Sequence, residues 1–279
     1  MLNALLFDLD GTLTDTDALH LLALQQLLLE EDGRTFTQEE FEAHVSGQAN
    51  ANMCRYLFPE RSVAEHEAFA ERKEVRFRQL SPQLMPMPGL LRLLDFAQEH
   101  GIGVCVVTNA PRANAEHMLE VLGLRQRFQT VLVAEELPRA KPDPLPYLSG
   151  LECLQATADQ ALAFEDSVPG LTAAVKAGIC TFGLATSQRP QTLLDAGAHR
   201  VINDFDDPQL WAEIRRRLDL PEGNGMRILA RPSGKETARE KETAGGKKVL
   251  AHHFGSGIQT EVPPLAGRAG GNIRGLQGQ

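Results

Sequence analysis

The sequence lacks any apolar run approaching the roughly 20 residues that a helix needs to cross a bilayer. Its opening apolar run has no basic segment ahead of it, and Asp8 and Asp10 interrupt it, so we expect no signal peptide. These two absences predict a protein without a membrane partner, and the cytoplasm is the expected compartment.

Cysteine is scarce and scattered. The four cysteines form no Cys-x-x-Cys pair and have no spacing with histidine that suits zinc: Cys54, Cys105, Cys153 and Cys180. This spacing argues against a zinc module. Cys105 and Cys180 lie inside apolar runs, where we expect buried thiols.

Positive charge is also in short supply, because the chain has a formal net charge of −9 and a pI near 5.4. This balance argues against broad affinity for nucleic acid, which we do not expect as a partner. An anionic substrate would need cations gathered locally. The length of 279 residues and a hydrophobic content of 42% are nevertheless ordinary for a globular protein with a sizeable core.

The charge changes sign near the C-terminus. Residues 222–279 carry nine Lys or Arg against five Asp or Glu, are rich in glycine and have few large apolar side chains. We expect region 221–279 to be mostly disordered. An electrostatic arm for a partner, or for the acidic remainder of the chain, is the alternative.

Short apolar runs that alternate with helical patterns of about ten residues make up most of the remaining chain. The expected strands cover residues 2–7, 102–107, 130–134, 160–164, 179–184 and, more weakly, 201–202. Such alternation predicts an α/β fold with a doubly wound parallel sheet. We expect residues 1–16 and 85–220 to form this core. From residue 18 to about 82 only helical patterns occur, which predicts an all-helical insertion over residues 17–84.

Asp8 and Asp10 directly follow the first expected strand and, two residues apart in extended backbone, point the same way. Two carboxylates in one pocket repel each other unless a cation or a shared proton relieves them. The pair therefore indicates a divalent metal, an acid/base pair, or both.

Further polar residues interrupt the apolar pattern where later strands end. Thr108 and Asn109 follow the second strand, Lys141 lies in the loop after the third, and Glu165 and Asp166 follow the fourth. In an open parallel sheet, ligands bind beyond the carboxyl ends of the strands. One cation, a hydroxyl, an amide and carboxylates from two strands suit a phosphate together with a hard divalent cation.

These segments resemble the four motifs of the haloacid dehalogenase-like hydrolase superfamily. The matching residues are Asp8-Leu9-Asp10-Gly11-Thr12, Thr108-Asn109-Ala110, Lys141-Pro142-Asp143-Pro144 and Glu165-Asp166-Ser167-Val168-Pro169-Gly170. The resemblance implies a Rossmann-like core with a small helical cap inserted after the first strand. Within the superfamily, Thr14-Asp15-Thr16 and His20 are similar to the group of β-phosphoglucomutase and phosphoglycolate phosphatase.

The resemblance also implies roles for these residues. Asp8 would be the nucleophile that forms an aspartyl-phosphate, and Asp10 would protonate the leaving oxygen and then activate water. Mg²⁺ would be held by the side chains of Asp8 and Asp166 and the backbone carbonyl of Asp10, with Glu165 as a direct or water-mediated ligand.

The remaining implied roles concern the substrate, a small phosphorylated metabolite. Thr108 and Asn109 would donate hydrogen bonds to the phosphoryl oxygens, and Lys141 would neutralise charge in the transition state. His20 would lie at the junction with the cap and contribute to substrate binding, although a histidine on an apolar helix is often only a packed residue.

Three other activities are alternatives to a phosphatase. A dehalogenase needs no acid at position 10, and a catalytically silent binding module should show a damaged motif. A sugar-phosphate mutase would be expected to carry an arginine near Ser46-Gly47, where this chain has Gln48. Substrate specificity would depend on cap side chains that face the crevice, with these candidates: Gln48, Asn50, Asn52, Arg55 and Arg76.

Overall fold

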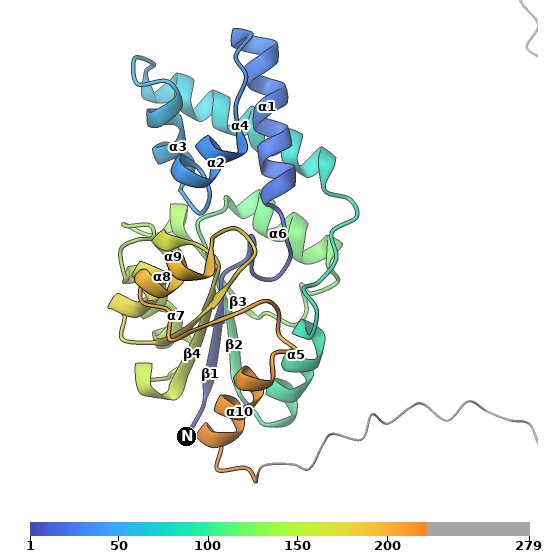
Figure 1. Ribbon diagram of the computed structural model, residues 1–279, viewed down its shortest axis with the longest axis vertical. Coiled ribbons are helices and arrows are strands. Elements are labelled where there is room, and N and C mark those ends of the chain that lie inside the picture. The colour runs from blue at the N-terminus through green and yellow to red at the C-terminus, as the bar shows by residue number, and fades with distance from the viewer. Residues whose placement is uncertain (222–279) are drawn as a thin grey trace, which may run out of the picture. The chain divides into compact units, whose positions relative to one another are not determined.

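A six-stranded parallel sheet forms the centre of the molecule, seen here in a computed structural model that describes residues 1–221 (Figure 1). Its strands are β1 (Ala4–Phe7), β2 (Gly103–Thr108), β3 (Thr130–Val133), β4 (Ala161–Glu165), β5 (Cys180–Leu184) and β6 (Arg200–Ile202). They lie in the order β3-β2-β1-β4-β5-β6. The predicted α/β class with a doubly wound parallel sheet is confirmed.

β1 lies at the middle of the sheet and is fully buried, as its apolar run predicts. Leu5 is in register with Val104 of β2 and Leu162 of β4. Successive side chains face opposite sides: Leu5 and Phe7 belong to one core cluster, whereas Ala4 and Leu6 belong to the other.

Helices cover both faces of the sheet. α5 (Leu90–Glu99), α6 (Arg112–Val121) and α10 (Pro208–Arg217) contribute to the larger core cluster, around the stacked rings of Phe7 and Phe164. α7 (Leu145–Cys153) and α8 (Val168–Lys176) contribute to the cluster on the other face. The short helix α9 (Pro190–Asp195) and two 3₁₀ turns, η1 (Ala134–Glu136) and η2 (Ala158–Gln160), were not expected from the sequence pattern.

Four helices lie between β1 and α5 in the chain: α1 (Asp17–Asp32), α2 (Gln38–His44), α3 (Asn50–Leu57) and α4 (Val63–Leu80). They pack around a hydrophobic cluster of their own that includes Leu24, Phe41 and Phe69. A capping box starts α2, in which the Thr37 hydroxyl accepts a hydrogen bond from the backbone N–H of Glu40. We refer to α1–α4 as the inserted helices.

The chain leaves the core and returns to it at neighbouring points. The backbone N–H of Met87 donates a hydrogen bond of 2.8 Å to the carbonyl of Leu13, so the outgoing and returning segments are joined. Figure 1 shows the inserted helices beyond the same edge of the sheet at which the strands end. This arrangement places them over the polar residues that follow the strands.

Two further sequence predictions can be compared with the structure. Cys105 is buried as expected, whereas Cys180, the first residue of β5, is only half-buried. Within residues 1–221, none of the helices combines the length and the apolar character needed to cross a membrane. The predicted tail, from residue 222 onward, lies outside the described residues.

Candidate active site

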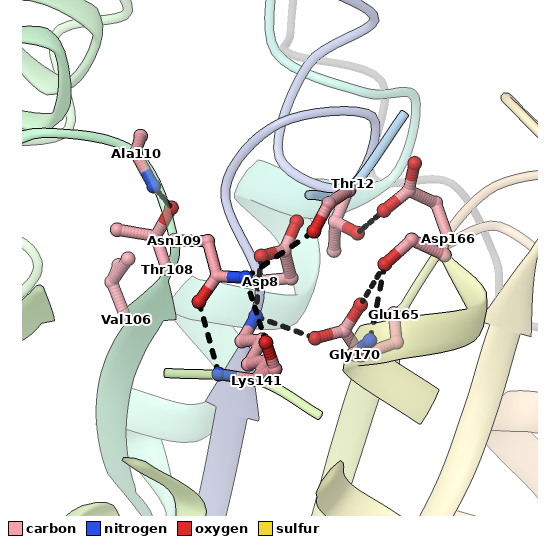
Figure 2. A network of polar contacts seen from close by, with 12 residues as sticks. Asp8, Thr12, Val106, Thr108, Asn109, Ala110, Lys141, Glu165, Asp166 and Gly170 are labelled. Atoms are coloured by element: carbon pink, nitrogen blue, oxygen red, sulfur yellow. Dashed lines mark hydrogen bonds and ion pairs between the residues drawn. The ribbon is translucent and has the colours of Figure 1, made fainter. Parts of the chain in front are cut away.

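The polar residues that follow β1, β2 and β4 meet at the carboxyl edge of the sheet (Figure 2). Asp8 comes directly after β1, Thr108 ends β2 and Glu165 ends β4. Their meeting is a consequence of β1 pairing in parallel with both β2 and β4.

Lys141 is the centre of this group. Its ammonium donates hydrogen bonds of 2.6 Å to Asp8 Oδ1 and of 2.6 Å to Glu165 Oε1. Only 3% of Lys141 is exposed. Burial alone would lower the pKa of Lys141, but the carboxylates of Asp8 and Glu165 raise it above its ordinary value. The lysine is therefore a fixed positive charge beside Asp8.

Glu165 is completely buried and accepts further hydrogen bonds. Tyr147 on α7 donates to Oε1 at 2.6 Å, and Ser167 donates to Oε2 at 3.3 Å. A side chain at Gly170, in the first turn of α8, would collide with the Glu165 carboxylate, because an added Cβ would lie 1.9 Å from Oε2. Oε1 of Glu165 thus binds Lys141 and Tyr147, and Oε2 binds Ser167.

Asp166 is held from two sides. Thr12 donates to Oδ1 at 3.4 Å, and the hydroxyl of Ser187, in the loop after β5, contacts Oδ2 and the backbone carbonyl. Gly11 has a φ of 71°, and an added Cβ there would lie 2.1 Å from Asp166 Oδ2. Only glycine fits this position without displacing the carboxylate.

The carboxylates of Asp8, Glu165 and Asp166 can each offer an oxygen within 4.8 Å of the others, and all three residues are buried. Burial raises the pKa of Asp8 to about 8. The pKa of Asp166 lies well above its ordinary value because of burial and the negative charge of Asp8. Lys141 balances one charge of the group, so the residual negative charge and the hard oxygen donors fit a divalent cation such as Mg²⁺.

Asp10 points its Oδ1 toward the inserted helices. The hydroxyl of Thr16 donates to this oxygen at 2.9 Å, and His20 Nε2 on α1 lies 2.9 Å from it. Burial alone would raise the pKa of Asp10, but the hydrogen bonds from His20 and Thr16 and the nearby charge of Lys73 bring it below its ordinary value.

The other ring nitrogen of His20 is also bonded. His20 Nδ1 lies 2.9 Å from Lys73 Nζ on α4, and the imidazole stacks on Phe77 with ring centroids 3.9 Å apart. Because both nitrogens of His20 already have partners, this residue orients Asp10 in the observed arrangement. Its predicted direct contact with substrate stays a prediction.

Thr108 and Asn109 lie on the opposite side of Lys141 from Glu165 (Figure 2). The Thr108 hydroxyl accepts a hydrogen bond of 3.0 Å from the backbone N–H of Ala110. The Asn109 side chain accepts from the N–H of Lys141 and donates to the carbonyl of Gly47, which belongs to the loop after α2. Asn109 thus links the core loop to the inserted helices.

A cavity of about 70 Å³ lies between these residues and the inserted helices. One water needs about 10–15 Å³ of such space, so the cavity has room for several waters or a small substrate. Of the five cap candidates, Gln48 and Asn50 line it, whereas Asn52, Arg55 and Arg76 do not. Lys73 and Glu74 line it instead.

Sequence reasoning missed five residues of the site: Thr12, Lys73, Glu74, Tyr147 and Ser187. Thr12 lies inside the first quoted motif and could have been singled out there. Nothing in the local pattern marks the other four, because their positions depend on how distant elements pack.

Comparison with known proteins agrees with this arrangement. Residues 5–184 match the model of the haloacid dehalogenase-like hydrolase family. The chain is 30% identical over 220 residues to validoxylamine A 7'-phosphate phosphatase of Streptomyces hygroscopicus subsp. limoneus, which covers 77% of this chain and 99% of that protein.

Two further proteins are similar to this chain. Identity to a phosphorylated carbohydrates phosphatase of Thermotoga maritima is 30% over 217 residues, covering 76% of this chain and all of that one. A crystal structure of CbbY from Rhodobacter sphaeroides with xylulose-(1,5)bisphosphate superimposes with a TM-score of 0.67 at 25% identity, covering 74% of this chain and 96% of that one. The chain therefore belongs to the haloacid dehalogenase-like hydrolase family.

Proposed function

We propose that this protein is a magnesium-dependent phosphatase that hydrolyses a small phosphorylated metabolite through an aspartyl-phosphate on Asp8. The observation that carries the proposal is the position of Asp8, whose carboxylate lies 2.6 Å from the buried ammonium of Lys141 and within 4.8 Å of a ligand oxygen of Asp166. The phosphatases among the relatives support it.

In the first step, an oxygen of Asp8 attacks phosphorus, and the bond between phosphorus and the substrate's ester oxygen breaks. This step divides one difficult displacement into two easier ones. Lys141 fixes the direction of Asp8 by binding Oδ1. Mg²⁺ held by Asp8 and Asp166 would supply the positive charge that allows an anionic nucleophile to meet an anionic phosphate.

Asp10 serves as the proton donor and acceptor. Because Oδ1 of Asp10 accepts from both Thr16 and His20, Oδ2 is the oxygen that would exchange a proton with the substrate. To act as the acid, Asp10 has to acquire a proton against its lowered pKa, and it then gives this proton to the departing alcohol oxygen. The resulting carboxylate then takes a proton from the water that attacks the aspartyl-phosphate, which releases phosphate and restores Asp8.

Lys141, Thr108 and Asn109 bind the transferring phosphoryl group. The Lys141 ammonium is fixed by Glu165, and the Thr108 hydroxyl and Asn109 amide are neutral donors at the edge of the same cavity. Preorganised donors of this kind stabilise the charge that develops on the equatorial oxygens.

The test is the variant Asp8→Asn, assayed with p-nitrophenyl phosphate and Mg²⁺. It removes the nucleophile but keeps the shape of the side chain, so we expect loss of turnover with an unchanged circular dichroism spectrum. Near wild-type turnover in this variant would contradict the covalent mechanism. Incubation of the wild-type protein with β-glucose 1-phosphate separates hydrolysis from isomerisation: free phosphate supports the phosphatase, and accumulation of glucose 6-phosphate contradicts it.

A further inference from the structure

The inserted helices bring both signs of charge to the cavity. Their ionisable lining residues in the described chain are Asp17, His20, Lys73 and Glu74. Among residues 1–221, no arginine lines the cavity. From this balance we infer, on the basis of the proposed function, that the substrate is a monophosphate whose remaining part carries hydroxyl groups and no negative charge.

Lys73 is the one lysine that the inserted helices contribute to the described lining, and its charge is already neutralised. Its ammonium lies 2.9 Å from Glu74 Oε1 and 2.9 Å from His20 Nδ1, and the residue is 5% exposed. A second anionic group on the substrate would have to share the Lys73 charge with Glu74, which already neutralises it.

Glu74 is itself held in place from the core. Asn114 on α6 donates a hydrogen bond of 2.5 Å to Glu74 Oε2, and Glu74 is 3% exposed. Displacing the Glu74 carboxylate from Lys73 would break a buried ion pair, which is strongly unfavourable. A substrate anion would therefore gain little from Lys73.

Asp17 adds an acidic group to the cavity. It begins α1, and its Oδ2 accepts a hydrogen bond of 3.2 Å from the hydroxyl of Ser46. A carboxylate in this position repels a carboxylate or a second phosphate. It readily accepts a hydrogen bond from a hydroxyl group.

The rest of the lining is neutral. Gln48 and Asn50 offer amides, and Phe41, Val45 and Met53 offer apolar surface. Amides can bind hydroxyl groups, and apolar side chains can cover the carbon skeleton of a polyol. This mixture suits a hydroxyl-bearing, uncharged group.

Arg55 and Arg76 of the inserted helices do not add positive charge to the cavity. Arg76 binds Gln26 and Glu30 on α1, and Arg55 binds Asn52 within α3. Neither residue lines the cavity. The phosphoryl group accordingly has Lys141, whereas the other end of the substrate has no free cation within the described part of the lining.

The test uses two matched pairs of substrates, with released phosphate as the readout. Glycerol 3-phosphate differs from 3-phosphoglycerate by a carboxylate, and fructose 6-phosphate differs from fructose 1,6-bisphosphate by a second phosphate. We expect kcat/KM to be at least tenfold higher for the uncharged member of each pair. Equal values, or a preference for the anionic member in either pair, would overturn the inference. If none of the four compounds nor p-nitrophenyl phosphate releases phosphate, the proposed function itself fails.

A charge-insertion variant provides a second measurement. Gln48→Arg places a cation in the cavity, and we expect it to raise kcat/KM for 3-phosphoglycerate relative to glycerol 3-phosphate by at least fivefold. Gln38→Arg introduces the same charge on the exposed surface of α2, outside the cavity, and should leave the ratio unchanged. An unchanged ratio in Gln48→Arg, or the same change in both variants, would count against selection by cavity charge.

Discussion

The ammonium of Lys141 and the carboxylate of Glu165 lie 2.6 Å apart, and Glu165 is completely buried. Such a pair contributes little net stability compared with an apolar pair. Removal of one partner is nevertheless destabilising, because the other remains as a buried charge without its ion-pair partner. The pair serves to position the Lys141 ammonium, which also binds Asp8.

Lys141→Met should therefore affect both stability and activity. We expect a loss of about 3 kcal/mol in the free energy of unfolding near neutral pH, measured by urea denaturation, because Asp8 and Glu165 both lose their buried ion-pair partner. Turnover should fall at least about 10²-fold, as when a preorganised donor to the transition state is removed.

The double variant Lys141→Met/Glu165→Gln separates the two effects. It removes the charge of Glu165 as well and leaves only Asp8 without its ion-pair partner, so part of the stability should return while the activity stays lost. A double variant as unstable as the single one would show that the unpaired charge of Glu165 is not a cause.

Gly11→Ala tests the fit of the predicted metal site. The added methyl group would collide with the Asp166 carboxylate, and we expect magnesium affinity to fall about 10- to 100-fold in a calorimetric titration. Gly33→Ala is the matched control, because Gly33 has a similar φ of 63° but nothing within 4 Å of an added Cβ. Both variants should lose about 1–2 kcal/mol of stability from backbone strain. A similar loss of affinity in both would contradict the steric explanation.

The carboxyl-edge residues could be predicted because each follows an apolar run that is too short for a helix and that pairs in parallel with its neighbours. Asp8, Thr108 and Glu165 all follow from this one rule. Tyr147 could not be predicted in the same way. Its sequence context indicates an ordinary helix, and only the packing of α7 on the sheet directs its hydroxyl to Glu165.

The residues of the inserted helices that line the cavity could not be predicted from the sequence either. Arg76 and Lys73 are three residues apart on α4, yet Lys73 lines the cavity and Arg76 binds α1. The rotation of α4 about its axis decides between them. That rotation is set by the burial of Phe69 among the inserted helices and of Phe77 in the core cluster, which sequence periodicity alone does not resolve.

Asp17→Asn should stabilise the protein in a pH-dependent manner. Burial raises the pKa of Asp17 from an ordinary value of 3.8 to about 6. Between these values the folded state binds more protons than the unfolded state, so the wild-type protein loses stability as pH rises, and the loss is complete above about pH 6.

The asparagine variant removes this penalty. We expect a gain of about 1–2 kcal/mol at about pH 7.5 and almost none at about pH 4, measured by urea denaturation in the presence of EDTA. An equal gain at both pH values would contradict the assigned ionisation.

Asn114→Ala should loosen the contact between α4 and the core. Asn114 donates to Glu74 at 2.5 Å and accepts from Arg78 at 2.6 Å, and it is completely buried. Loss of both bonds leaves buried polar groups unsatisfied, which costs about 1–3 kcal/mol. We expect faster amide hydrogen exchange in α4 and a lower kcat, because Lys73 and His20 lose the support of Glu74.

Asn52→Ala is the control for this variant. Asn52 bonds only to Gln48 and Arg55 in the described structure, so its loss leaves the contact with α6 intact. Equal exchange rates in α4 for the two variants would refute the role assigned to Asn114.

The hydrogen bond between Met87 and Leu13 joins the segments that enter and leave the inserted helices at a single place on the core. A segment whose entry and exit nearly coincide can be lengthened, shortened or exchanged without altering the register of any strand. The chemistry at phosphorus and the choice of substrate can consequently be changed separately. Replacing the inserted helices with those of another protein of the family should change which phosphate ester is cleaved, while Asp8 and Lys141 keep their alignment.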